Sequence, residues 1–391
     1  MNDVAAALPH RRAIADLPAS KIREVATLGM VAASADTIPL WFGEPDLPTP
    51  DFINRAAARA LAEGHTFYTL NRGIPELREE IARYMSRLHG RAFASDRITV
   101  TASAMNAIAL LMQTLVDHGD NAVLLAPVWP NIAASVGIMG GDARQVALAE
   151  TGTGWRLDLD RLFDAVDERT RLVFVNSPSN PTGWMMTADE QRALLDFCRR
   201  RGLWVVADEV YDRIVYDRPH APSFLDVGEP EDLVLRISSF SKSWCMTGWR
   251  LGWITAPAAF GPVLEKMNEF NVASAASMAQ HAGIVALRDG EAFVRETVAR
   301  YGRARDLVFQ RLAAMPRVRL VRPEAAFYAF FAVEGMDDSL AFAKRLLADT
   351  GVGLAPGAAF GPGGEGRLRL CYAATPATLS EAMDRLQPAL S

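Results

Sequence analysis

A lysine that follows small hydroxyl side chains is the first feature of the sequence that could do chemistry. The segment Ser238–Lys242 reads Ser-Ser-Phe-Ser-Lys and comes directly after the mostly apolar run Leu233–Ile237, which predicts a buried strand. A lysine amine that is desolvated at such a strand end can form a Schiff base with a carbonyl compound. The hydroxyl groups and Arg250, the next charged residue, could then hold an anionic group nearby. An exposed loop lysine is the alternative interpretation, because lysine is rarely buried.

Three further turns place polar groups at strand ends or helix starts. Asn176–Gly183 follows a predicted strand at Leu172–Val175, and Asp208–Tyr211 follows one at Leu203–Ala207. A carboxylate at a buried strand end is costly unless a cation is paired with it. At Ser103–Met105 a strand turns into a helix, whose free N–H groups suit a phosphate. An amine, a buried carboxylate, a hydrogen-bonding amide and phenol, and a phosphate cradle are what pyridoxal 5′-phosphate (PLP) requires.

The elements that must position these residues alternate between strand and helix. Short apolar strands between helices predict an α/β fold with a mostly parallel sheet covered on both faces. Ligands of such sheets bind at the carboxyl ends of the strands, where the residues above lie. A capping box at Thr187–Glu190 predicts the start of a helix that ends at Gly202. The predicted strands are 98–101, 121–126, 172–175, 203–207, 233–238 and 251–256.

The last third of the chain has a different pattern, typical of a smaller α+β domain. It contains long helical patterns over Glu291–Ala314 and Ser339–Asp349, and strands at Ala326–Val333 and Arg367–Ala373. Thr375 followed by a proline predicts the start of a final helix. We therefore expect a large domain over residues 46–285. The small domain is expected to combine residues 1–45 with residues 286–391.

Composition narrows the class of protein. The chain has 391 residues, is 50% hydrophobic and carries a net charge of −5, so we expect neither nucleic-acid binding nor a polybasic membrane contact. The N-terminal residues do not form a secretory signal, and the two charge-free stretches at Ile98–Val116 and Asn121–Gly141 read as strand, turn and helix rather than membrane spans. Three widely spaced cysteines indicate a reducing cytoplasm. The six histidines form no zinc-binding spacing, so no metal is expected.

Motifs along nearly the whole chain resemble those of the class I/II aminotransferases, the aspartate aminotransferase superfamily of fold-type-I PLP enzymes. The resemblance implies a homodimer with shared active sites. The implied reaction is transfer of the amino group of an L-amino acid to a 2-oxo acid by ping-pong half-reactions. The motifs are Gly43–Asp46, Tyr68 with Gly73–Arg78, Ala126–Trp129, Ser179–Gly183, Asp208–Tyr211, Ser239–Lys242 with Gly248–Arg250, and Arg369–Ala373.

The resemblance also implies a role for each residue around the cofactor ring. Lys242 holds PLP as a Schiff base and then moves the substrate proton, while Asp208 pairs with the protonated pyridine nitrogen. Asn180 and the catalytic Tyr211 hydrogen-bond the ring hydroxyl, and Trp129 stacks on the ring. The implied phosphate ligands are Ser103, Ala104, Met105, Ser239, Arg250 and, from the partner subunit, Tyr68.

The substrate α-carboxylate is expected to bind Arg369, because a guanidinium matches a carboxylate bidentately. Gly43 allows the backbone to approach that carboxylate closely, and Asn180 and Trp129 border it. Ser103 stands where relatives usually carry glycine, so we expect an ordinary φ there and a hydroxyl contact to phosphate; the alternative is a turn that differs slightly from that of the relatives.

The amino donor is expected to be apolar or aromatic rather than aspartate. Met105 occupies a position where several aspartate-specific relatives resemble one another in carrying lysine, and methionine cannot bind a distal carboxylate. Trp41 and Phe42 support this expectation. Lys21 and Arg72 lie in segments that border the pocket in relatives, so either could bind an acidic side chain, although solvated charges are the favoured interpretation.

Other functions remain as alternatives. A β-lyase of the same fold would share the Schiff base and the proton abstraction. A non-catalytic PLP-binding regulatory protein would need a DNA-binding domain, for which the N-terminal segment has no room. A nicotinamide dehydrogenase would depend on Gly361–Gly366, which matches GxGxxG but lies before a strand rather than between a strand and a helix.

Overall fold

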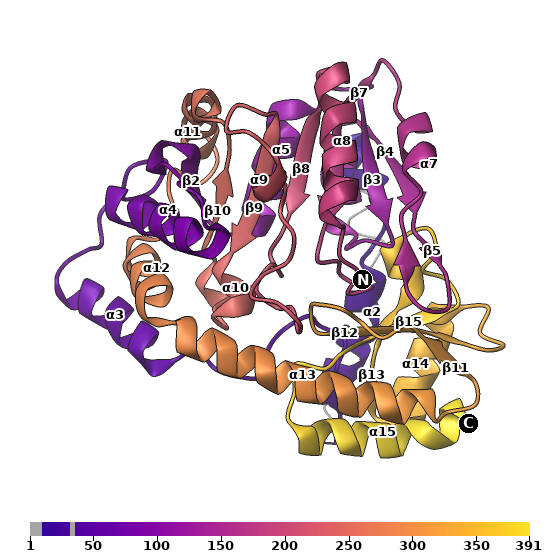
Figure 1. Ribbon diagram of the computed structural model, residues 1–391. Coiled ribbons are helices and arrows are strands. Elements are labelled where there is room, and N and C mark those ends of the chain that lie inside the picture. Colours follow the sequence, from indigo (N-terminus) through magenta and orange to yellow (C-terminus); the bar gives the residue numbers. More distant parts are fainter. Residues whose placement is uncertain (1–9, 32–35) are drawn as a thin grey trace.

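A seven-stranded sheet forms the centre of the larger part of the molecule (Figure 1). The computed structural model describes residues 10–31 and 36–391, so the N-terminal segment 1–9, on which the prediction about a secretory signal depends, lies outside the described residues. The strand order is β2-β10-β9-β8-β7-β3-β4. The strands are β2 (Ile98–Thr101), β3 (Asn121–Ala126), β4 (Asp142–Ala147), β7 (Thr170–Asn176), β8 (Trp204–Asp208), β9 (Val234–Ser239) and β10 (Gly252–Thr255).

The predicted mostly parallel sheet is confirmed, but the sequence pattern did not predict that one of its strands runs antiparallel to its neighbours. β3, β4, β7, β8 and β9 pair in parallel, whereas β10 runs antiparallel to both β9 and β2. β10 returns directly from the short turn after Lys242, and a strand that returns without a crossover helix must run antiparallel.

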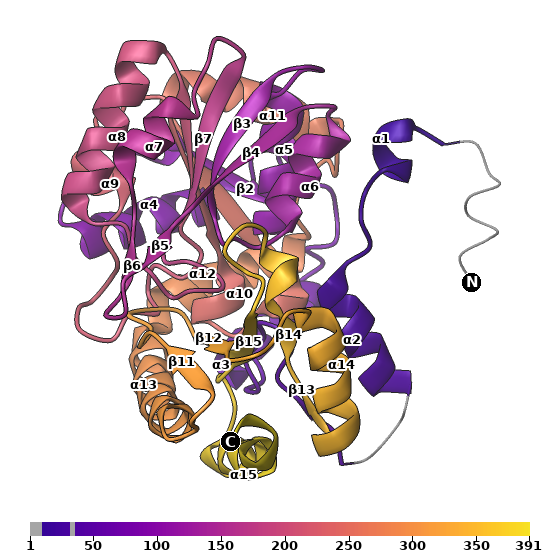
Figure 2. The same cartoon turned by 90° about the vertical axis from the view of Figure 1, so that its right-hand side faces the viewer.

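Both faces of the sheet are buried, which explains the continuous apolar strands. Ala122 and Leu124 of β3 pack into one core, and Val123 and Leu125 pack into another on the opposite face. Figure 2 shows the two helical layers on either side of the sheet. One layer holds α5 (Ala104–Leu115), α6 (Asn131–Ile138) and α11 (Gly261–Glu269); the other holds α7 (Leu159–Asp164), α8 (Ala188–Arg201) and α9 (Phe224–Val227).

Helix boundaries follow the capping residues that the sequence indicates. α8 begins after the Thr187 cap, whose capping box with Glu190 is complete, and it ends at the left-handed Gly202. The two charge-free stretches are β2 with α5 and β3 with α6, as predicted. No helix among the described residues is long and apolar enough to cross a membrane.

A second, antiparallel sheet in the order β11-β12-β15-β14 lies below the first in Figure 1. Its strands are β11 (Val318–Leu320), β12 (Tyr328–Val333), β14 (Ala355–Pro356) and β15 (Arg367–Cys371). Around it lie α13 (Glu291–Ala313), α14 (Ser339–Thr350), α15 (Pro376–Leu390) and, from the N-terminal segment, α2 (Lys21–Val31). β1 (Ile38–Pro39) pairs in parallel with β13 (Val352–Gly353), which attaches the N-terminal segment to this part. The predicted domain boundaries at residues 45 and 285 stay predictions.

The remaining elements complete the flank near β2. α12 (Ser277–Asp289) packs against α3 (Asp51–Ala62) and α4 (Pro75–His89), and α4 in turn packs on β2.

Short elements elsewhere in the chain include α1 (Arg12–Ala15), α10 (Phe240–Ser243) and the hairpin of β5 (Ala149–Glu150) with β6 (Trp155–Arg156).

Candidate active site

A cavity of about 290 Å³ lies between the carboxyl ends of the parallel strands and the smaller sheet. It is the place at which ligands of parallel sheets bind. The cavity brings together most of the predicted site residues, from segments more than 300 positions apart. These are Gly43, Ala104, Met105, Trp129, Asn180, Asp208, Tyr211, Ser239, Lys242, Arg250 and Arg369.

Lys242 is half-buried on α10, the single helical turn that follows β9. Its Nζ donates a hydrogen bond to the Gly43 carbonyl oxygen at 2.7 Å. Burial lowers the pKa of this amine to about 8, with Arg369 and Arg250 adding to the effect and Cys371 and Glu44 opposing it. About one tenth of the amine is therefore neutral at pH 7, far more than for an ordinary lysine, and nucleophilic attack on a carbonyl requires the neutral form.

Asp208 is a buried carboxyl group at the end of β8. One of its oxygens accepts the Val210 N–H at 3.3 Å. Burial raises the pKa of Asp208 to about 7, against the lowering effects of that backbone N–H, of Lys242 and of Arg236. Because burial holds the carboxyl partly protonated near pH 7, a cationic partner would shift it to the ionised form. A protonated ring nitrogen is such a partner.

Tyr211, Asn180 and Arg369 form the wall where a ring hydroxyl and a carboxylate could bind. The Tyr211 hydroxyl lies 2.6 Å from the hydroxyl of Tyr328, and burial raises the pKa of Tyr211. The Arg369 guanidinium donates to Asn180 Oδ1 at 2.9 Å and to the Trp41 carbonyl oxygen. Its Nε is buried and has no partner among the described residues. The guanidinium therefore keeps a free donor for an acidic ligand.

The phosphate end is built from α5, the turn after β9, and Arg250. Ser239 Oγ accepts the Ser241 N–H at 3.1 Å, and Arg250 donates to the Thr247 carbonyl oxygen at 2.6 Å. Gly252 lets β10 approach α5 closely, because a Cβ there would lie 3.0 Å from the Ala104 nitrogen and 2.7 Å from the Ser238 oxygen. Ala104 and Met105, the first residues of α5, line the same cavity as Ser239 and Arg250, and the first N–H groups of a helix suit a phosphate.

Ser103 departs from the expectation in its backbone. Its φ is 121° and its ψ is 164°, a conformation that glycine adopts and L-residues rarely do, so the expected ordinary φ is wrong. The side chain caps α5 by accepting the Asn106 N–H at 3.0 Å, and the residue is not part of the cavity lining. Its predicted contact to phosphate remains untested.

We expect Ser103→Gly to raise the free energy of unfolding of the cofactor-free protein by about 1 kcal/mol. The backbone strain costs about 1–3 kcal/mol, whereas glycine in place of serine at a cap costs only a few tenths. Urea unfolding measures the difference. Thr187→Gly, at a cap with the ordinary φ of −72°, is the control and should be less stable than the wild type. A loss of stability in both variants would contradict the strain assigned to Ser103.

Two predicted basic contacts do not lie at the cavity. The Arg72 guanidinium donates to the Asp96 and Ile98 carbonyl oxygens and to Thr99 Oγ1, so it is engaged within the fold and lies outside the cavity lining. Lys21 is outside the lining, whereas Arg23, two residues later on α2, is part of it. Two residues span about half a helical turn, so the two side chains lie on opposite faces of α2, and the sequence spacing did not resolve which of them faces the cavity.

Tyr68 lies outside the cavity of its own chain, and its side chain is 93% exposed. This placement leaves its implied role in the partner subunit untested. The sequence reasoning missed Tyr328, although the residue lies within the predicted strand 326–333; in the structure it begins β12, which pairs with the strand of Arg369.

The residues present fit PLP. Lys242 offers a neutral amine for the aldehyde, Asp208 a buried carboxyl for the ring nitrogen, and the α5 terminus with Ser239 and Arg250 offers donors for the phosphate. Fold and cavity together define the class of protein as a fold-type-I PLP-dependent enzyme.

Comparison with known proteins identifies the family within this class. The family "Aminotransferase class I and II" matches residues 35–386. The "Probable aspartate/prephenate aminotransferase" of Aquifex aeolicus is 34% identical, with 92% of each chain covered. The aspartate aminotransferase structure from Thermotoga maritima has a TM-score of 0.90 at 32% identity, covering 97% of this chain and 100% of that one. The aromatic aminotransferase structure from Pyrococcus horikoshii has a TM-score of 0.86 at 32% identity, covering 94% and 98%.

The chain belongs to the class I and II aminotransferases. It is a transaminase that uses pyridoxal 5′-phosphate, as the resemblance in the sequence implied.

Proposed function

We propose that this transaminase takes the amino group from an L-amino acid with an apolar or aromatic side chain and passes it to a 2-oxo acid in two alternating half-reactions. The lining of the cavity beyond the carboxylate anchor supports the donor class. Ile22, Phe42, Met105 and Trp129 supply apolar surface there. Among the arginines that line the cavity, only Arg369 has a buried N–H group without a hydrogen-bond partner among the described residues. The carboxylates of the amino donor and of the 2-oxo acid would therefore bind it in turn.

The residue roles that we propose follow from the contacts in the cavity. Bound PLP withdraws electrons from the substrate α-carbon. The ionised Asp208 carboxylate keeps the ring nitrogen protonated, which maintains that withdrawal. The Lys242 amine, neutral in part at pH 7, takes the α-proton and returns it. Arg369 holds the α-carboxylate, so that the α-hydrogen lies within reach of Lys242.

The donor class depends on which side chain meets the substrate's side chain. Met105 lies at the start of α5 and contacts Asn131 through its sulfur at 3.5 Å. It offers no charge to a distal carboxylate. Arg23 is the competing signal, because it lines the cavity and the relatives include proteins named for aspartate. Its guanidinium is exposed and rests over the Phe42 ring at 5.7 Å, so an anion bound there would stay largely solvated.

A donor screen tests this proposal. Oxo-acid release from single donors without acceptor is expected to be fastest with phenylalanine, tyrosine or leucine, and slower with aspartate by roughly 10-fold or more. Met105→Lys should move the preference towards aspartate, and Arg23→Gln, the control, should leave the order of donors unchanged. Aspartate as the fastest donor of the wild type, with the preference lost in Arg23→Gln, would contradict the proposal.

We also propose a homodimer with shared active sites. The segment of Phe67, Tyr68 and Leu70 exposes apolar surface, and Phe270 nearby is 80% exposed. The two segments are joined, since Asn71 contacts Glu269 at 3.4 Å. The Asn271 side chain accepts a hydrogen bond at 2.9 Å from Asn106. Asn106 directly follows Met105, which lines the cavity. This apolar surface next to the cavity is what a second copy would cover.

Tyr68→Phe tests the shared site. The phenol of Tyr68 in one subunit would reach the phosphate held by the other. Its loss is expected to weaken PLP binding roughly 10- to 100-fold, the range for a hydrogen bond to a charged group. Equilibrium binding of PLP measures the effect, with Phe67→Leu as a control that keeps the apolar surface. An unchanged affinity, or a monomer in analytical ultracentrifugation, would contradict the shared site.

A further inference from the structure

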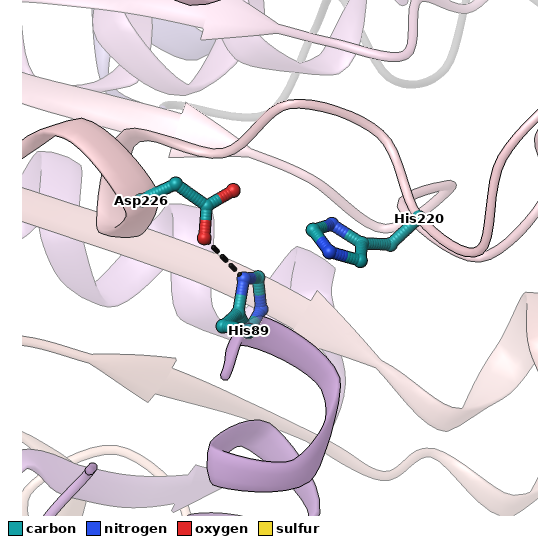
Figure 3. A group of neighbouring side chains, drawn as sticks. All are labelled: His89, His220 and Asp226. Atoms are coloured by element: carbon teal, nitrogen blue, oxygen red, sulfur yellow. Dashed lines mark hydrogen bonds and ion pairs between the residues drawn. The ribbon is translucent and has the colours of Figure 1, made fainter. Parts of the chain in front are cut away.

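Two histidines and an aspartate meet on the flank of the molecule, away from the cavity (Figure 3). His89 is the last residue of α4, His220 lies in the loop between β8 and α9, and Asp226 lies in α9. His89 and Asp226 are 137 residues apart in sequence. One nitrogen or oxygen atom from each of the three side chains lies within 4.8 Å of the others.

The hydrogen bonds of both histidines define their tautomers. His89 Nδ1 lies 2.7 Å from Asp226 Oδ1, and His220 Nδ1 lies 2.8 Å from the Ala221 carbonyl oxygen. A carboxylate and a carbonyl oxygen only accept, so each Nδ1 carries the proton. In the neutral form of each ring, Nε2 then presents a lone pair. This is the arrangement in which a histidine binds a metal through Nε2 while an oxygen holds its other nitrogen.

His89 Nε2 has no hydrogen-bond partner among the described residues, although the side chain is only 1% exposed. Leaving a buried polar nitrogen without a partner costs about 1–3 kcal/mol, so a ligand at this atom would be favourable. In Figure 3 this side of the His89 ring faces the ring of His220, and the ring centroids are 4.7 Å apart.

The surrounding contacts hold the three residues in place. Asp226 Oδ2 accepts the Ser223 N–H at 3.1 Å in a capping box, so the carboxylate cannot rotate freely. The Phe93 ring packs edge-on against His89. The nearby cation Arg91 is already engaged, because it donates to the Leu225 and Gly228 carbonyl oxygens. Asp226 thus supplies a negative charge next to two imidazole rings, which favours a divalent cation.

We propose that His89 and His220 bind one divalent cation of the zinc class through their Nε2 atoms, with Asp226 as the carboxylate that orients His89. Imidazole nitrogens suit zinc, nickel and copper rather than magnesium or calcium. Water would complete the tetrahedral coordination. The site joins the end of α4 to α9, so bound metal would stabilise the fold. The sequence did not predict this site, because His89 and His220 lie far apart along the chain and form no metal-binding spacing.

Equilibrium dialysis of the PLP-loaded enzyme against Zn²⁺, followed by metal analysis, tests the proposal. The wild type is expected to retain one Zn²⁺ per chain and to melt at a higher temperature with Zn²⁺ than with a chelator. His89→Gln and His220→Gln should each weaken Zn²⁺ binding at least ~10-fold, and Asp226→Asn roughly 10- to 100-fold. Transamination in these variants should be unchanged, so this result is independent of the proposed donor.

His65→Gln and His281→Gln are matched controls, because those two rings also lie close together, at 4.1 Å, but without such a buried unpartnered nitrogen. Both controls should bind Zn²⁺ like the wild type. If the wild type retains no stoichiometric Zn²⁺, or if the folded His220→Gln variant binds it as tightly as the wild type, the proposed site is wrong.

Discussion

Replacing Lys242 by alanine is expected to abolish covalent attachment of PLP and to slow amino transfer by at least roughly 1,000-fold. The chain contains only four lysines, and Lys242 alone among them lines the cavity. No other amine of the lining can take over the Schiff base or the proton. The near-visible absorbance band of the PLP-loaded protein should disappear from the variant after gel filtration, and oxo-acid release from a donor should fall in parallel.

Lys266→Ala is the matched control, because Lys266 is an exposed lysine on α11. It should keep both the band and the rate of the wild type. A Lys242→Ala variant that is folded and still carries the covalent cofactor band would assign the Schiff base to another residue.

Asp208→Asn is expected to cause the second large loss, roughly 100-fold or more in the rate of oxo-acid release. The amide is similar in shape but carries no charge, so nothing in its place would keep the ring nitrogen protonated. Arg369 and Lys242 are untouched, so the Michaelis constant of the donor should change much less than the rate. Steady-state kinetics separate the two effects. A variant with near-normal turnover would contradict the role of Asp208.

The same substitution is expected to stabilise the cofactor-free protein. Burial raises the pKa of Asp208 to about 7 from an ordinary value near 3.8, so the folded state holds a proton that the unfolded state releases as the pH rises. The contribution of Asp208 to stability therefore falls between about pH 4 and pH 7 and is constant above that range. A difference of about three pKa units corresponds to about 4 kcal/mol as an upper limit.

Urea unfolding of cofactor-free wild type and Asp208→Asn at pH 5 and pH 8 measures this linkage. The stability advantage of the variant should grow with pH. Asp349→Asn, at an exposed position on α14, should show no such growth. An advantage that shrinks as the pH rises would mean that the free carboxyl is ionised in the folded protein.

The sequence predicted the central architecture and most of the cavity because both depend on local pattern. Buried strands read as apolar runs, and residues directly after parallel strands must meet at one edge of the sheet, as Asp208 and Ser239 do. The direction of β10 was not predictable in this way, because an apolar strand looks the same whether its neighbours run with it or against it.

The features that the sequence did not predict depend on contacts between distant segments or on backbone conformation. Ser103 adopts a glycine-like φ although it is not glycine, because the turn between β2 and α5 is determined by its surroundings. Arg23 rather than Lys21 faces the cavity because of the rotation of α2, which packing on α14 determines. His89 and Asp226 meet only because the C-terminal end of α4 reaches α9 in the fold.

The most direct test of the account is the amount of product formed from one donor without an acceptor. A ping-pong transaminase with Lys242 and Asp208 in these roles should release one equivalent of oxo acid per active site and then stop. It should release no ammonia, and turnover should resume when a 2-oxo acid is added. Continuous release of oxo acid and ammonia without acceptor would show elimination by a β-lyase of this fold, and would contradict the proposed amino transfer.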